Sequence, residues 1–174
     1  MKKGFIGLMS VLLGMMIQAP SVLAGTLVEF EGGIGVIAVS SAAGTQNADG
    51  TFPNVNRNDV RGIGPGGQPW VIRTFEAKIK ENGDIRAEGR GLVLAGGNNI
   101  GTANGVTQVF ATLFCGSDTP HNSGLHPLAA DGDFKIKDTL TPPLPDPCNN
   151  PVLLIRVAAG RWIAAGIPKV KDED

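Results

Sequence analysis

The sequence has no tyrosine and only two cysteines, two histidines and two tryptophans among its 174 residues. Scarce aromatic residues argue against a membrane-spanning barrel, which carries aromatic girdles at both interfaces. Charged residues of both signs are well mixed, so no basic patch predicts contact with nucleic acid or an anionic membrane surface. With so few histidines and cysteines, a zinc cluster would need carboxylates to complete it.

Familiar enzyme motifs are also missing. Residues 62–67 superficially resemble a dinucleotide-binding loop, but Pro65 interrupts the pattern and a strand rather than a helix is expected to follow. Ser117, Asp118 and His121 are the residue types of a hydrolytic triad, yet no Gly-x-Ser-x-Gly turn surrounds the serine. The sequence therefore predicts no catalytic residue and no cofactor, and an enzyme is the less favoured class.

Residues 1–24 have the pattern of a secretory signal peptide, expected as a helix. Lys2 and Lys3 precede an apolar run at residues 5–17, and Val22 and Ala24 are the small residues before a cleavage site. That run is shorter than the roughly 20 residues of a membrane span, and no later run is long enough. Cleavage after Ala24 leaves 13 Lys+Arg and 16 Asp+Glu, a net charge of −3. We expect a secreted or periplasmic protein with no integral membrane span.

Both cysteines lie in the exported part of the chain. In an oxidising compartment, the leading expectation is a disulfide between Cys115 and Cys148. The alternative is a pair of buried free thiols.

Residues 106–115 are apolar on both faces of an expected strand. Val109, Ala111, Leu113 and Cys115 alternate with residues that include Phe110 and Phe114. Such a strand is typical of the middle of a sheet that is covered on both sides.

Alternating patterns elsewhere predict further strands. Residues 26–31 and 34–41 flank Gly32-Gly33, which fits a hairpin slightly better than one strand with a bulge. Residues 70–80 and 85–94 form a hairpin; parity favours a three-residue loop, 81–83, that sets Ile79 opposite Ile85. Further strands are expected at residues 133–140, 152–157 and 161–167.

These patterns predict an all-β fold, an antiparallel sandwich or barrel of about eight short strands. It forms a single domain at residues 25–168, and residues 169–174 are a charged tail. Residues 89–101, Gly-Arg-Gly-Leu-Val-Leu-Ala-Gly-Gly-Asn-Asn-Ile-Gly, and the later Gln-Val-Phe-Ala-Thr-Leu-Phe-Cys resemble segments of secreted bacterial proteins. This resemblance supports export and the all-β class, and implies no activity or site residue.

His121 and His126 are the local group with metal-ligand chemistry, and Asp118, Asp131 or Asp133 are candidates to complete a set. The simpler interpretation is two exposed loop histidines. The leading function is an exported β-domain with a non-enzymatic binding or structural role and no identifiable partner. The alternative is a secreted enzyme or small metal-binding domain with its site in loops 96–105 and 116–131.

Overall fold

The computed structural model describes residues 24–41, 44–50, 54–116 and 119–169, and in these residues the chain is all β, without a helix. The strands are β1 (Thr26–Gly35), β2 (Val39–Ser41), β3 (Val55–Arg57), β4 (Trp70–Val71), β5 (Thr74–Lys80), β6 (Asp84–Arg90), β7 (Val93–Leu94), β8 (Gln108–Cys115), β9 (His121–Asn122), β10 (His126–Pro127), β11 (Phe134–Thr139), β12 (Pro151–Val157) and β13 (Trp162–Pro168). The predicted all-β class is confirmed. The predicted leader helix and most of the charged tail lie outside the described residues.

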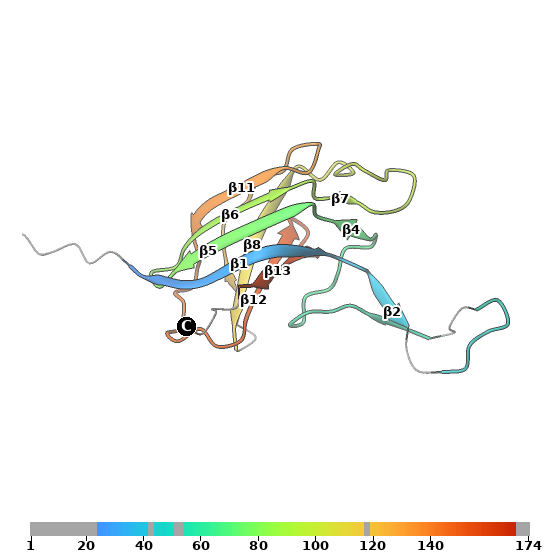
Figure 1. Cartoon of the computed structure of the whole chain (residues 1–174), viewed down its shortest axis with the longest axis horizontal. Coiled ribbons are helices and arrows are strands. Elements are labelled where there is room, and N and C mark those ends of the chain that lie inside the picture. Colours follow the sequence, from blue (N-terminus) through green and yellow to red (C-terminus); the bar gives the residue numbers. More distant parts are fainter. Residues whose placement is uncertain (1–23, 42–43, 51–53, 117–118, 170–174) are drawn as a thin grey trace, which may run out of the picture.

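One antiparallel sheet dominates the molecule and curls into a half-barrel. Its strands follow the order β10-β8-β12-β13-β1-β5-β6-β11, and β9 pairs with β8. Figure 1 shows β1, β5, β6 and β11 side by side in front of β8, β12 and β13, with β2 on an arm that leads away from the sheet. The two smaller sheets, β2-β3 and β4-β7, lie off this path.

β1 belongs to both halves of the sheet. Its first part pairs with β5 and its second part with β13, and the register shifts between Phe30 and Gly33. Gly32 has a φ of 90°, in the left-handed region that suits glycine at a bulge. The predicted hairpin about Gly32-Gly33 is therefore wrong: the glycines bend one continuous strand, because its two parts have different neighbours.

The hairpin of β5 and β6 has the three-residue loop, residues 81–83, that was predicted from the alternation of its side chains. Ile79 lies opposite Ile85, and Gly83 has a φ of 86° at the end of the three-residue loop. Side chains therefore alternate cleanly along both strands, with Phe75, Ala77 and Ile79 buried and Glu76 and Lys78 exposed. The predicted strands near residues 133–140, 152–157 and 161–167 are confirmed as β11, β12 and β13.

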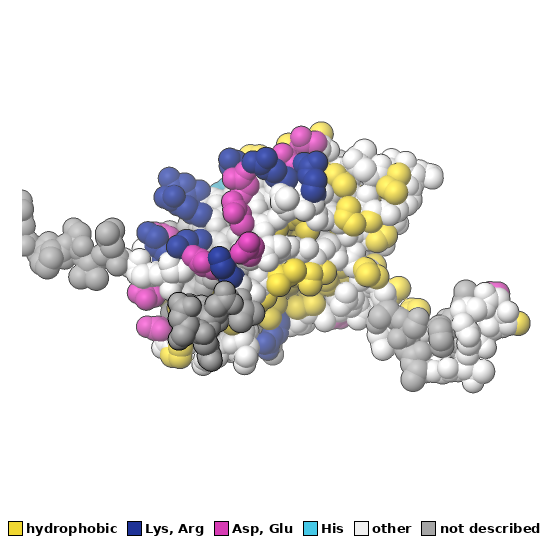
Figure 2. Space-filling view, in the orientation of Figure 1, with side chains coloured by type: hydrophobic (Ala, Val, Ile, Leu, Met, Phe, Trp, Pro, Cys, Tyr) yellow, Lys and Arg dark blue, Asp and Glu magenta, His cyan; other side chains and the backbone are white. Residues whose placement is uncertain are grey.

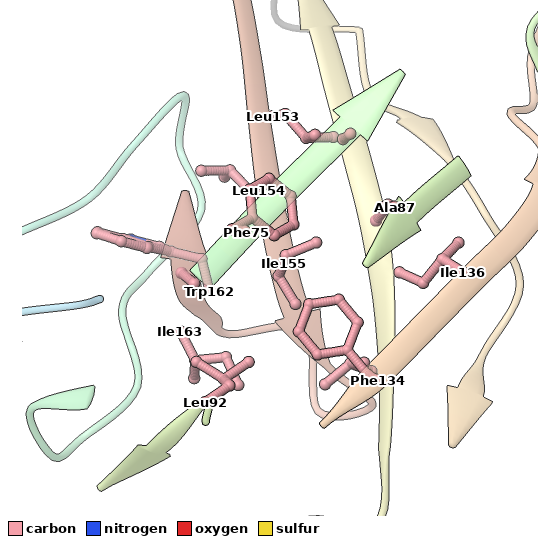
Figure 3. Close-up of a cluster of buried hydrophobic side chains, with 14 of the residues drawn as sticks. Phe75, Ala87, Leu92, Phe134, Ile136, Leu153, Leu154, Ile155, Trp162 and Ile163 are labelled. Atoms are coloured by element: carbon pink, nitrogen blue, oxygen red, sulfur yellow. The ribbon is translucent and has the colours of Figure 1, made fainter. Parts of the chain in front are cut away.

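The hollow of the curled sheet is filled by apolar side chains. Figure 3 shows Phe75, Phe134, Ile136 and Leu153 converging from β5, β11 and β12. The Phe75 and Phe134 rings lie 6.3 Å apart. Trp70 and Trp162 are buried, as expected for core residues. Burial of this apolar surface is the main stabilising contribution to the fold.

β8 pairs on both sides, with β12 on one and with β9 and β10 on the other. Every residue from Ala111 to Cys115 is buried, which confirms a strand covered on both faces. The Arg156 guanidinium lies 4.8 Å from the centre of the Phe110 ring and donates hydrogen bonds to Thr112 and Gly160, so it covers part of the outer side. Burial lowers the pKa of Arg156.

The predicted disulfide is present between Cys115 and Cys148, whose Cα atoms are 4.7 Å apart. It fastens the end of β8 to the proline-rich segment before β12. Disulfides persist mainly in oxidising compartments, which fits the expected export. The described residues contain no helix of the length and apolarity that a membrane crossing would require.

Candidate binding site

The two histidines lie at the seam, where residues 121–128 meet β11 and the chain just beyond it. His121 is 3% exposed, and its Nδ1 is 2.8 Å from the Pro142 carbonyl oxygen, so Nδ1 carries the proton and donates. His126 Nε2 is 3.2 Å from Asp138 Oδ2. The structure thus gives each histidine its own partner, and the prediction of two exposed loop histidines does not fit the buried His121.

The metal hypothesis gains no further ligands from the described residues. Within them, no three His, Cys, Asp or Glu side chains are grouped so as to hold a metal ion. Asp133 Oδ1 accepts from the Gly91 N–H at 2.9 Å and so joins two distant segments of the chain. Asp131 Oδ1 accepts from the Asp133 N–H, as is typical of a turn. Asp118 and Ser117 lie outside the described residues. The metal site and the triad stay hypotheses.

Asp138 joins the two sides of the seam. Its Oδ2 accepts from the Gly124 N–H at 2.7 Å and its Oδ1 from the Thr139 N–H at 2.8 Å. These two hydrogen bonds, the Gly124 bond first, hold the pKa of the Asp138 carboxyl below its ordinary value, and His126 contributes less. Backbone pairing of Asn122 with Thr141 continues the seam. These contacts join residues 122–124 to Asp138 and Thr141, so we interpret the seam as a structural link between two parts of the sheet.

Loops 96–105 and 116–131 meet at a hollow of about 490 Å³. Gly101 comes from the first loop and Asp131 from the second, and Arg73 is the other charged residue of the lining. The remaining lining consists of apolar residues and glycine. Each of the two loops contributes one residue to this lining, and one carboxylate and one guanidinium do not make a nucleophile and its base, so the alternative site stays a hypothesis.

A hollow of about 620 Å³ lies on the outer face of β1, β5, β6 and β11. Its lining contains nine charged side chains, Glu29, Glu31, Glu76, Lys78, Arg86, Glu88, Lys135, Lys137 and Lys169. These are the outward residues of the alternating pattern, and their inward neighbours belong to the core. We call this surface the charged face.

Strand register sorts these charges by sign. Lys78 and Lys137 each lie directly opposite Arg86, which forms a basic row across β5, β6 and β11. Glu31 and Glu88 each lie directly opposite Glu76, which forms an acidic row across β1, β5 and β6. Figure 2 shows the acidic side chains as a band between two groups of basic ones. Charges of one sign therefore lie side by side on neighbouring strands.

Ion pairs neutralise only part of each row. Lys78 Nζ is 2.8 Å from Glu29 Oε1, and Glu88 is paired with both Arg90 and Lys135. The hydrogen bond from Arg90, followed by that from Lys135, lowers the pKa of Glu88. Among the described residues, no ion pair is found for Arg86, Lys137 or Glu76. Arg86 and Lys137 are thus adjacent cations outside any ion pair, and Arg86 also lies close enough to Asp84 to attract its carboxylate.

The charged face does not emerge from charges counted along the chain, because its rows run across neighbouring strands. One signal was present: a loop that sets Ile79 opposite Ile85 also sets Lys78 opposite Arg86 and Glu76 opposite Glu88.

Comparison of the chain with protein-family models, curated proteins and solved structures gives no match.

Proposed function

We propose that the protein is an exported, non-enzymatic binding domain that engages a charged ligand through the charged face. The observation that carries this proposal is the sorting of like charges into rows in a hollow of the described surface. Like charges directly opposite one another destabilise a sheet. An arrangement that disfavours folding and serves no core packing is typical of a functional surface.

Three features support binding over catalysis. The charged side chains stand on paired strands, which hold a recognition surface rigid. The hollow is open and lies outside the core, which suits a ligand that is bound without being enclosed. The resolved carboxyl shifts, at Asp84, Glu88 and Asp138, all lower the pKa, so these groups favour the charged form rather than a proton-donating acid.

Retention on a polyanion tests the proposal. The protein expected after export has a net charge of −3, so its overall charge does not favour binding to immobilised dextran sulfate. The basic row should nevertheless retain it at low salt. R86A/K137A should elute at a salt concentration at least about twofold lower, because counterion release depends on local cationic contacts.

The matched control is R57A/R161A, which removes the same charge from residues outside the hollow. It should elute close to the unmodified protein. An equal loss in both double variants would mean nonspecific attraction and would contradict the proposal.

The metal-binding alternative has its own measurement. His121 and His126 remain the candidate ligands, and calorimetric titration with zinc or copper ions reports binding directly. Heat above background that disappears in H121A/H126A would favour that alternative over the charged face.

A further inference from the structure

The charged face presents two charges of opposite sign, Glu76 and Arg86, that belong to no ion pair found in the described residues. Glu76 lies opposite Glu88, and Arg86 lies opposite Lys78, so Glu76 and Arg86 are diagonal neighbours on adjacent strands. Diagonal neighbours in an antiparallel pair are about 7–8 Å apart. They form no ion pair with each other. Lys137, opposite Arg86 on the other side, doubles the positive charge at one end.

Resting on the proposed function, we infer that the ligand of the charged face is a zwitterion whose anionic and cationic groups reach two diagonal positions of adjacent strands, where the backbone positions are about 7–8 Å apart. Its anion lies between Arg86 and Lys137, and its cation lies against Glu76. A peptide that ends in lysine has this chemistry, because its terminal carboxylate and its side-chain ammonium are about 7 Å apart when the four-carbon stem is extended.

A uniform polyanion fits this surface less well. Along the strand direction, outward residues recur about every 7 Å, so a chain of anions following β6 would pass from Arg86 to Glu88 and meet repulsion there. A polyanion would meet only cations if it ran across the strands, along the basic row of Lys78, Arg86 and Lys137. A ligand with both signs uses the acidic row as well, and the acidic row at the same time rejects purely anionic competitors.

The arrangement also explains why the rows are left partly unpaired. If Arg86 and Glu88 were exchanged, each of three like-charge pairs, 78–86, 86–137 and 76–88, would become an opposite-charge pair. Three favourable contacts, 88–135, 88–90 and 84–86, would change the other way. Counting pairs therefore favours neither order, and the chain retains the observed one. That order keeps two cations adjacent and free to hold one anionic group, as a carboxylate with two oxygens requires.

Titration of the ¹⁵N-labelled full protein with four acetylated tripeptides tests the inference. The probes are acetyl-Gly-Gly-Lys, its C-terminal amide, acetyl-Gly-Gly-norleucine and acetyl-Gly-Gly-diaminopropionate, which remove the carboxylate, the ammonium and the spacing in turn. We expect the lysine peptide to shift amide signals of β5, β6 and β11 at low salt, with a Kd on the order of 1 mM because the charges are exposed. Each analogue should bind at least about fivefold more weakly.

The variant R86E/E88R should lose lysine-peptide binding although its composition and net charge are unchanged. The control R57D/D59R, which exchanges an exposed ion pair outside the hollow, should bind like the unmodified protein. Equal binding of the norleucine and lysine peptides would reduce the site to an anion site and overturn the zwitterion, leaving the proposed function intact. If no peptide binds while R86A/K137A still weakens retention on the polyanion, the zwitterion inference also fails and the proposed function stands. If that double variant behaves like R57A/R161A, both proposals fail.

Discussion

Asp138 is the residue on which the seam depends most directly. It accepts hydrogen bonds from the Gly124 N–H across the seam and from the Thr139 N–H on its own strand, and His126 approaches the same carboxylate. Hydrogen bonds to a charged acceptor are stronger than those to a neutral one. Because the side chain is partly exposed, solvent weakens this contribution.

D138N should reduce the free energy of unfolding at pH 7 by about 1–2 kcal/mol. The pKa of Asp138 is lower in the folded protein than its ordinary value of 3.8, so the ionised group stabilises the fold fully above that value. The contribution is lost as the pH falls through the folded pKa. Urea unfolding at a series of pH values should therefore show the difference between D138N and the unmodified protein shrinking below pH 3.8. A difference that stays constant down to pH 2 would contradict this role.

At the scale of the strands, alternation decides which side chains face outward, whereas register decides which of them meet. Alternation in β5 and β6 is visible in the sequence, and the hairpin register followed from its short loop. The extension of the rows to β1 and β11 was not predictable, because those pairings join segments separated by roughly 50 residues along the chain.

Other parts of the fold were predictable only in outline. The apolar residues on both faces of β8 predict a strand covered on both faces, and the structure confirms this prediction. The glycine pair in β1 was misread as a turn, because a bulge and a hairpin both use left-handed glycine. The sequence predicts loop histidines, whereas short pairings with β8 hold the two histidines in β9 and β10. Two-residue strands leave no periodic signal in a sequence.

The exchange R86E/E88R should leave the melting temperature close to that of the unmodified protein. It replaces three like-charge cross-strand pairs with opposite-charge pairs and reverses three favourable contacts, those of Glu88 with Lys135 and Arg90 and that of Arg86 with Asp84. Thermal unfolding followed by circular dichroism measures this, and R57D/D59R is the control for exchanging charges at exposed positions. A clear drop confined to R86E/E88R would mean that the rows stabilise the sheet, which would remove the main reason for assigning them to a ligand.

At the scale of the whole molecule, the disulfide between Cys115 and Cys148 adds a covalent link to the stabilisation that the apolar core provides. Cys115 and Cys148 are 33 residues apart in sequence and enclose the seam and β11. C115S/C148S should be less stable by about 4 kcal/mol in the chain-entropy description, since the unfolded chain regains the freedom that the closed loop removed. Urea unfolding with and without reductant checks this, and reductant should have no effect on C115S/C148S. Two reactive thiols in the untreated native protein would contradict the disulfide.

The pairing of β1 with β13 sets an order of events during synthesis. Phe30 lies opposite Pro168, so the strand made near the beginning of the chain finds this partner only after nearly the whole domain has been made. At a synthesis rate of about 5–20 residues per second, β1 waits on the order of ten seconds with one edge unpaired. Unpaired edges invite association with other chains. β13 is therefore the strand that ends this exposure, and a chain cut short before β13 leaves the sheet with an open side.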